Sequence, residues 1–363
     1  MDYKVKACVG DGVYRDLTEM AQSGADFAKM KDATVLITGA GGFIGFYLTA
    51  ALLLRNDLYG DNIRVLALVR SRERAEKKFG RLLQRPDLTL CVQDVTAPIQ
   101  AERADYVIHA ASQASNIQFE TDPVGTINAN LTGTANVLDF ARKSRSRAVL
   151  VVSSLKVYGT VYGSAEKLRE SDSGYIDFTS YKNCYAMGKR AGETLAASYC
   201  REYGMHVRLA RPAYIYGASS LNDDRVWAQF IANVVRGEDI LLKSNGAAKR
   251  SFCYVSDTAA ALLMILLDGE DATPYNIANE ASDVTIRGFA KKACEVFPEK
   301  SMKLVFADPA DEAEPQETVT PLRQVPELLD NSRLLALGWQ PKVDLAEGNR
   351  RSLRILTEQN GQG

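Results

Sequence analysis

The first strong pattern in the chain is an alternation of short apolar runs with longer amphipathic segments. Residues 34–39 and 147–154 are rich in Val, Leu and Ile, as expected of strands that helices cover on both faces. Runs of the same kind predict further strands at 63–70, 88–95, 104–112 and 206–217. Helix-length segments lie between them, the first at 43–54. This order predicts an α/β fold built on a Rossmann-type, doubly wound parallel sheet.

The pattern loosens beyond Gly217. It predicts a helix over 223–237, then a short strand over 251–257 that leads into an apolar helix. An acidic, proline-containing run at 307–318 is typical of an exposed loop. We therefore expect a smaller C-terminal α/β lobe over the open end of the sheet, where the crevices of α/β proteins bind ligands.

The pattern also suggests where the parts of the chain begin and end. Residues 1–32 form an N-terminal extension, in which 11–24 predict a short helix closed by Gly24. The expected division is given by three sets of ranges: 1–32 for the extension, 33–217 with 251–272 for the NAD(P)-binding Rossmann domain, and 218–250 with 273–363 for the substrate-binding lobe.

Composition narrows the classes of protein that fit. The 363 residues are enough for a large core with a second lobe, and the formal net charge of −1 gives no field that would attract nucleic acid or an anionic membrane. No apolar run is long enough to cross a bilayer, and the N-terminus lacks the pattern of a signal peptide. Six scattered cysteines without a CxxC pair and only two histidines disfavour disulfide scaffolds and metal sites. We expect a reduced, cytoplasmic protein without a metal.

A glycine-rich turn joins the first strand to the first helix. Gly39, Gly42 and Gly45 have the spacing GxxGxxG, with Phe43 and Ile44 between the last two. Glycines at these places allow a tight turn and a close approach of a pyrophosphate, and the helix N-terminus offers amide donors to it. A purely structural turn is the alternative. The flanking strand and helix favour a dinucleotide site that these five residues hold.

The next two strand ends bear on the identity of the cofactor. Arg70 follows the second strand, where an acidic residue would favour NAD. An arginine there can bind a 2′-phosphate, which would favour NADP, but it could equally begin a solvated basic helix. Asp94 and Val95 follow the next strand and could contact the adenine, although Asp94 could also be a turn residue. NAD and NADP both stay open.

A tyrosine and a lysine four residues apart carry the candidate chemistry. Tyr185 and Lys189 share one face of a predicted helix. A phenol titrates near 10, so it needs a nearby positive charge to act as a base at neutral pH, and Lys189 could supply that charge. Ser154, at the end of a predicted strand, could hold the oxygen of the substrate in line with Tyr185. The set predicts hydride transfer at a carbon that bears a hydroxyl.

At this point the chain resembles the extended short-chain dehydrogenase/reductase superfamily, in particular its nucleotide-sugar epimerases, dehydratases and decarboxylases. The resemblance rests on nine runs in the order of the family: TGAGGFIG (38–45), VIHAAS (107–112), NLTGT (130–134), SSLKVYG (153–159), YAMGK (185–189), RPAYIYG (211–217), RSFCYVSD (250–257), YNIAN (275–279) and LGWQP (337–341). They span nearly everything from residue 34 onward, so they are specific for the superfamily but less specific for one reaction.

The resemblance implies roles for individual residues. Ser154, Tyr185 and Lys189 would be the catalytic residues, and Asn130 would support them. The strand end His109, Ala110 and Ala111 would lie along the cofactor. Residues expected at the substrate, chiefly at its diphosphate, are Arg250, Arg323 and Tyr214, the last in place of an asparagine that the family often uses. The resemblance also implies a homodimer.

One departure from the family separates the possible reactions. Dehydratases carry acidic residues, and decarboxylases a glutamate, between the serine or threonine and VYG, whereas this chain has Leu155 and Lys156. We read this as favouring an isomerase, a nucleotide-sugar 4-epimerase that retains NAD as a prosthetic group. The alternatives are an NADPH-dependent reductase of a 4-keto sugar, suggested by Arg70, or a lyase, either a 4,6-dehydratase or like the UDP-glucuronate decarboxylases, which residues 221–230 resemble. A non-catalytic cofactor sensor is disfavoured by the intact catalytic set.

Overall fold

The computed structural model describes residues 3–101, 103–313 and 323–360. At its centre lies a seven-stranded sheet in which every pair of neighbouring strands is parallel, in the order β10-β6-β5-β4-β1-β2-β3. The strands are β1 (Thr34–Thr38), β2 (Arg64–Val69), β3 (Leu88–Val92), β4 (Tyr106–His109), β5 (Ala148–Val152), β6 (Val207–Pro212) and β10 (Pro274–Ile277). The predicted fold class is confirmed.

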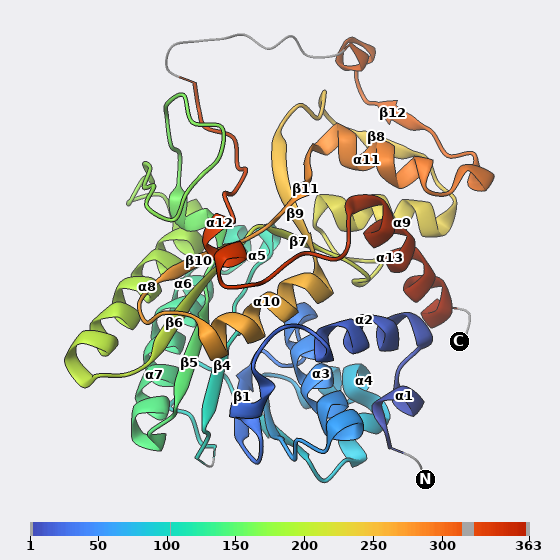
Figure 1. Ribbon diagram of the computed structural model, residues 1–363. Coiled ribbons are helices and arrows are strands. Elements are labelled where there is room, and N and C mark those ends of the chain that lie inside the picture. Colours follow the sequence, from blue (N-terminus) through green and yellow to red (C-terminus); the bar gives the residue numbers. More distant parts are fainter. Residues whose placement is uncertain (1–2, 102, 314–322, 361–363) are drawn as a thin grey trace.

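Helices cover both faces of this sheet (Figure 1). The side chains of β1 show why, since Val35 and Ile37 belong to the core beneath α3 (Phe43–Tyr59) and α10 (Val255–Asp268), whereas Leu36 belongs to a second core. The helices on that second face are α7 (Thr132–Ser144) and α8 (Cys184–Tyr203), with α6 (Pro123–Asn130) packed against both. Burying one such aliphatic side chain contributes about 1.5–3 kcal/mol to the free energy of folding. The continuous apolar runs therefore favour strands that are buried on both faces.

The order of the strands fixes where a ligand can bind. The chain passes from β1 to β2 and β3 on one side, and then returns to place β4 on the other side of β1. The connections after β1 and β4 therefore diverge, which leaves a crevice at the carboxyl ends of these two strands. The glycine-rich turn and the segment after His109 both lie at this edge.

The smaller lobe contains two short sheets. One has the order β11-β9-β7 and the other pairs β12 with β8. Its elements are β7 (Tyr214–Tyr216), α9 (Val226–Arg236), β8 (Ile240–Leu242), β9 (Lys249–Tyr254), β11 (Asn279–Thr285), α11 (Ile286–Glu295), β12 (Leu304–Phe306), α12 (Ser332–Ala336) and α13 (Leu345–Asn360). Figure 1 shows this lobe above one end of the central sheet.

Two details differ from the expected boundaries. The sequence assigns residues from 273 onward to the smaller lobe, but β10 pairs with β6 and completes the central sheet. The apolar helix α10 packs on that sheet, so the chain leaving it returns parallel to β6, as a crossover requires. In the predicted acidic loop, a 3-10 turn occupies Pro309–Glu312, and residues 314–318 lie outside the described part of the chain.

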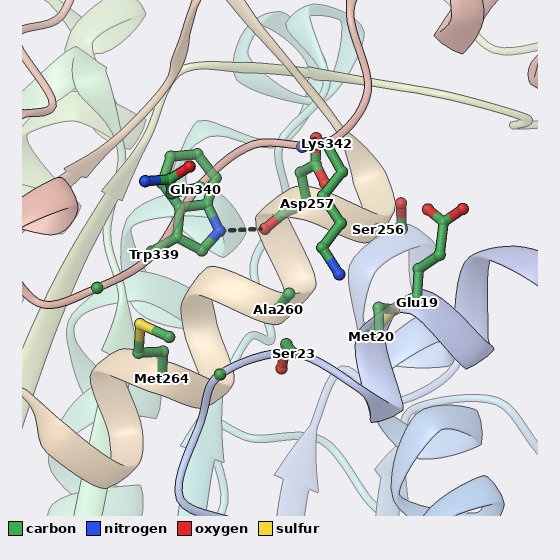
Figure 2. A pocket seen from close by; sticks show the side chains of 12 residues that line it. Glu19, Met20, Ser23, Ser256, Asp257, Ala260, Met264, Trp339, Gln340 and Lys342 are labelled. Carbon is green, nitrogen blue, oxygen red and sulfur yellow. Dashed lines mark hydrogen bonds between the residues drawn. The ribbon is translucent and has the colours of Figure 1, made fainter.

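The N-terminal extension is built into the fold. It contributes α1 (Val5–Cys8) and α2 (Asp11–Ala21), and α2 packs against α3, α10 and α13. The predicted helix is therefore present, although it ends three residues before Gly24. Together with α10 and the segment before α13, the extension encloses a cavity of about 120 Å³ (Figure 2). Trp339 Nε1 donates a hydrogen bond of 3.1 Å to the Asp257 carbonyl beside it.

A buried ion cluster fastens α2 to α13. Arg351 donates to Asp16 at 2.9 Å, to Glu19 at 2.7 Å and to Glu347 at 2.9 Å. Burial raises the pKa of Asp16 to about 6 although Arg351 acts in the opposite direction. The cluster therefore depends on the guanidinium of Arg351, without which the carboxylate of Asp16 would be buried with no positive charge beside it.

Among the described residues, no helix combines the length and the apolar composition that a membrane crossing needs.

We expect Arg351→Met to lower the free energy of unfolding by about 3–5 kcal/mol, because it leaves the Asp16 carboxylate buried without its cation. Urea denaturation measures this. Arg350→Met is the matched control: Arg350 is the exposed neighbour and pairs with Glu347 at 3.1 Å, so its loss should cost less than about 1 kcal/mol. Equal effects of the two variants would contradict the structural role of the cluster.

Candidate active site

The glycine-rich turn is shaped by contacts that admit no side chain. Gly39 has φ +68°, and a Cβ there would lie 2.8 Å from the Ala111 backbone. A Cβ on Gly45, in the first turn of α3, would lie 2.2 Å from the Gly39 carbonyl oxygen. The glycines thus let the turn, the helix and the end of β4 come into contact. The first amide groups of α3 have no partner within the helix and are available to an anion.

A cavity of about 510 Å³ lies beside this turn. Its lining brings together residues from the ends of four neighbouring strands: Gly39, Gly42, Arg70, Asp94, Val95, Ala110 and Ala111. All of these were expected at a cofactor from the sequence. Small residues leave the backbone of the turn open, while amide donors and Arg70 suit phosphate groups. The chain thus offers a site that fits a nicotinamide dinucleotide.

Asp94 and Arg70 both line the cavity that suits the cofactor, and their charges interact. Asp94 accepts hydrogen bonds from the amide and the hydroxyl of Thr96, at 2.9 and 2.8 Å. These bonds, with a contribution from the charge of Arg70, lower the pKa of Asp94. Asp94 therefore has the turn role considered from the sequence, while it also lines the cavity. Its position is compatible with either cofactor.

His109 and Asn130 lie behind the cavity and hold its wall. His109 is buried, with Nδ1 2.8 Å from Thr38 Oγ1 and Nε2 3.1 Å from Thr134 Oγ1. Burial, together with the charge of Lys189, lowers the pKa of His109 to about 3, so the ring is neutral. Asn130 Oδ1 accepts a hydrogen bond of 2.8 Å from Ser112, just after β4. Both side chains support the strand end, and neither lines the cavity.

A second cavity of about 450 Å³ contains the predicted catalytic residues. Ser154, Tyr185 and Lys189 all line it, and it shares Ala110 and Ser112 with the cofactor cavity. Ile44 also borders it, whereas the ring of Phe43 stacks on Trp227 at 5.9 Å. The two cavities are therefore neighbours. A cofactor in one can reach a substrate in the other.

The strand β5 and the helix α8 fix the catalytic side chains. Lys189 is buried, and its Nζ donates a hydrogen bond of 2.7 Å to the carbonyl of Val152, the last residue of β5. The same Nζ lies 5.8 Å from the centre of the Tyr185 ring. That ring stacks on Phe119, with 5.0 Å between the centroids. Tyr185 is thus held on two sides.

The groups around the Tyr185 hydroxyl decide how readily it ionises. Burial raises its pKa, while a hydrogen bond with Ser154 and the charge of Lys156 lower it. From the sequence we expected this charge to come from Lys189. Burial lowers the pKa of Lys189 itself to about 8, and its Nζ is engaged by Val152. In the sequence Lys156 stands out only as a departure from the family, and no pattern there indicates its effect on the phenol.

One carboxylate organises the far end of the catalytic cavity. Glu327 accepts a hydrogen bond of 2.7 Å from Lys156 Nζ through one oxygen. Its other oxygen accepts from the Tyr214 hydroxyl at 2.6 Å and lies 2.9 Å from Arg250 Nε. Lys156 Nζ also donates to the Tyr214 hydroxyl at 3.0 Å. We call these four residues the Glu327 cluster.

The Glu327 cluster bears on the predicted substrate residues. Tyr214 and Arg250 belong to it and line the catalytic cavity. Arg323 is exposed, outside the lining of that cavity, and its carbonyl accepts a hydrogen bond of 3.0 Å from Gly163. Glu327 was not predicted from the sequence, because it lies 171 residues from Lys156 and no spacing relates the two. A carboxylate four residues after Arg323 was the only signal.

The sequence and the fold are both similar to those of known proteins. Residues 35–278 match the model of the NAD dependent epimerase/dehydratase family. UDP-glucuronic acid decarboxylase 5 of Arabidopsis thaliana is 34% identical over 319 residues, which are 86% of each chain. UDP-glucuronic acid decarboxylase 1 of Danio rerio is 28% identical over 90% of this chain and 73% of its own.

Solved structures show the same fold. UDP-glucose 4-epimerase of Thermotoga maritima superimposes with a TM-score of 0.72 and 21% identity, over 90% of this chain and 99% of that one. A dTDP-glucose 4,6-dehydratase of Streptomyces venezuelae, solved with NAD, gives a TM-score of 0.71 and 22% identity, over 91% and 98%. At these identities the likeness concerns the fold alone.

We expect Arg70→Ala to weaken the binding of NADP⁺ about tenfold and to leave that of NAD⁺ within twofold, since only NADP⁺ has a 2′-phosphate for the guanidinium to bind. Calorimetric titration measures both affinities. Arg72→Ala is the control, because Arg72 is exposed and outside the lining of the cavity. A parallel loss of both cofactors in Arg70→Ala would rule out contact with the 2′-phosphate.

We expect Ser154→Ala to move the rise of activity with pH to higher pH. The hydrogen bond with Ser154 lowers the pKa of Tyr185, so its loss raises that pKa, and the phenolate that takes the proton then forms only at higher pH. One hydrogen bond to a charged group is worth ~1.5–3 kcal/mol, so the rate at neutral pH should fall at least about tenfold. The pH profile of nicotinamide reduction measures this.

Ser153→Ala is the matched control for this change. Its hydroxyl is buried and has no hydrogen-bond partner among the described residues, so the profile should keep its position. An unchanged profile in Ser154→Ala would show that Ser154 does not act on Tyr185.

Proposed function

The chain belongs to the NAD dependent epimerase/dehydratase family, and within it we propose that the protein decarboxylates UDP-glucuronate through a 4-keto intermediate. The observation that carries the proposal is the convergence of Ser154, Tyr185 and Lys189 on one cavity beside the dinucleotide site. Relatives that share a third of the residues over most of the chain are UDP-glucuronic acid decarboxylases, which supports this choice of reaction.

The charge in the cavity favours an acidic sugar. Lys156 and Arg250 bring two positive charges to the Glu327 cluster, and Glu327 brings a single negative one. The cluster therefore keeps an excess of positive charge at the edge of the catalytic cavity. A sugar carboxylate and a nucleotide diphosphate are both anions that such a surface attracts.

The first part of the reaction uses the catalytic residues identified from the sequence. A nicotinamide dinucleotide in the glycine-lined cavity supplies the hydride acceptor and, later, the hydride donor. Tyr185 takes the proton of the carbon 4 hydroxyl as that carbon is oxidised, and Ser154 holds the oxygen by a hydrogen bond. Lys189, whose ammonium group is fixed by the Val152 carbonyl, would hold the cofactor when it is bound.

The second part needs no base at carbon 5. Once carbon 4 is a ketone, the sugar is a β-keto acid. The bond between carbons 5 and 6 breaks, carbon dioxide leaves, and the electron pair forms an enolate whose oxygen stays beside Ser154 and Tyr185. Hydrogen bonds from these hydroxyls stabilise the enolate. Carbon 5 then takes up a proton, and Tyr185 returns one to the oxygen as carbon 4 is reduced.

Because decarboxylation needs no base at carbon 5, the absence of an acidic residue at positions 155–156 does not argue against this reaction. A 4,6-dehydratase must remove the proton on carbon 5, and no carboxylate of the loop after β5 is placed to do so. Decarboxylation breaks a different bond and generates the enolate without that base. The second candidate is the 4-epimerase favoured from the sequence, because the catalytic set alone suffices for it. The two reactions differ in the fate of the carboxylate.

We expect purified protein with UDP-[6-¹³C]glucuronate and added NAD⁺ or NADP⁺ to release ¹³C-labelled carbon dioxide and form UDP-xylose, as followed by NMR. Tyr185→Phe should slow this about 10²–10⁴-fold, the range for loss of a general acid–base group. Tyr181→Phe is the control, since that exposed hydroxyl bonds only to Glu120 among its described partners. Formation of UDP-galacturonate that keeps the ¹³C label at carbon 6 would show that the protein is a 4-epimerase instead.

A further inference from the structure

In the first part of the proposed reaction Lys156 acts only through its charge, which lowers the pKa of Tyr185. It is also the most accessible cation of the Glu327 cluster. Its side chain is 42% exposed, against 25% for Arg250. An ammonium group has three N–H donors. Glu327 and Tyr214 engage two of them, which leaves one for a group in the catalytic cavity that Lys156 lines.

Lys156 is also placed close to the reacting carbon atoms. Its backbone amide donates a hydrogen bond of 3.2 Å to Ser154 Oγ, so both residues move as one short turn. Its charge acts on the Tyr185 hydroxyl. Ser154 and Tyr185 hold the oxygen on carbon 4, and carbon 5 is the next atom of the sugar ring. The ammonium therefore stands beside the groups that hold carbon 4, where it can reach an atom bonded to that carbon.

We propose that Lys156 is the acid that protonates carbon 5 after carbon dioxide has left. The inference rests on the proposed decarboxylation. One N–H bond of the ammonium breaks and a C–H bond forms at carbon 5, while the enolate electrons return to the ring and restore the ketone at carbon 4. Lys156 becomes a neutral amine and regains its proton from water, which its exposure admits.

The rest of the cluster keeps Lys156 ready for this step. Burial lowers the pKa of Lys156, but Tyr214 and Glu327 outweigh it and raise the pKa above its ordinary value. Glu327 is kept ionised in turn, because the charges of Lys156 and Arg250 outweigh the effect of burial and lower its pKa. The resting lysine is therefore fully protonated. When the carboxylate of the sugar leaves as carbon dioxide, the ammonium group faces the enolate that remains.

The other polar groups of the cavity are less suited to the step. Lys189 is committed to the Val152 carbonyl, and Tyr185 has to serve the oxygen on carbon 4. The guanidinium of Arg250 does not give up a proton in proteins. Glu327 is ionised and has none to give. Arg225, which also lines the cavity, is a guanidinium as well and is paired with Asp223. Lys156 is therefore the charged group with a proton to give among the described residues of this cavity and its cluster.

The test follows UDP-glucuronate in D₂O with the wild-type protein and Lys156→Met. The wild-type protein should place a single deuterium at one of the two positions on carbon 5 of UDP-xylose. Because Lys156→Met removes a charge that lowers the pKa of Tyr185, the rates are compared on the alkaline plateau of the pH profile. There Lys156→Met should still reduce the nicotinamide at a rate within about threefold of wild type, but its formation of UDP-xylose should fall about 10²-fold or more. Any product should be a mixture of molecules with one deuterium at either of the two positions, because water then protonates either face.

Two further variants separate this role from a structural one. Lys156→Arg keeps the charge and the pairing with Glu327 but cannot release a proton, so it should fold normally and show the same loss. Lys182→Met removes an exposed lysine that pairs with Glu120 and should behave as wild type. If Lys156→Met and Lys156→Arg formed UDP-xylose at the wild-type rate with the same single deuterium, the proposal would be overturned.

One outcome overturns the proposed function together with this inference. It is a wild-type protein that reduces the nicotinamide with UDP-glucuronate but releases no carbon dioxide. Nicotinamide reduction and carbon dioxide release test the proposed function, whereas the position of the deuterium tests the role of Lys156. The three are measured separately, so a failure of one proposal is distinguishable from a failure of the other.

Discussion

The carboxylate of Glu327 is the group on which the catalytic cavity depends. It joins the turn after β5 to β7 and β9 through Lys156, Tyr214 and Arg250, while its own backbone carbonyl accepts a hydrogen bond of 3.1 Å from Ser251. Without it, an ammonium and a guanidinium would share a partly buried site with no counter-ion, which is unfavourable for both. One side chain thus attaches the smaller lobe to the sheet and sets the charge that a substrate meets.

The site combines two kinds of construction. The parallel sheet supplies rigid positions, since Gly39, Ser154 and the carbonyl of Val152 lie at the carboxyl ends of β1 and β5, on one edge of the sheet. The smaller lobe adds charged groups beside the catalytic cavity, chiefly Glu327 and Arg250. Oxidation at carbon 4 needs only the first set. In the proposed reaction, the fate of the 4-keto sugar depends on Lys156 in the turn after β5, together with the groups of the smaller lobe that hold it. A change in these few residues would let one fold serve different reactions.

The sequence predicted what is encoded locally. Apolar runs gave the strands of the central sheet, glycine spacing gave the cofactor turn, and Tyr185 and Lys189 are four residues apart on one helix. Contacts between distant segments left no such signal. Lys156 and Glu327 are 171 residues apart, and Arg351 and Asp16 are 335 apart. The strand β10 was assigned to the wrong part of the fold for the same reason, since its partner β6 is far away along the chain.

The most direct test of the account is the transfer of hydride from carbon 4. UDP-glucuronate that carries deuterium at carbon 4 should reduce the bound nicotinamide more slowly than the unlabelled sugar, and mass spectrometry should find the deuterium on the reduced cofactor. It should then return to carbon 4 of the UDP-xylose. Equal rates, with the deuterium never leaving the sugar, would show that Tyr185 and Ser154 do not serve an oxidation at this carbon.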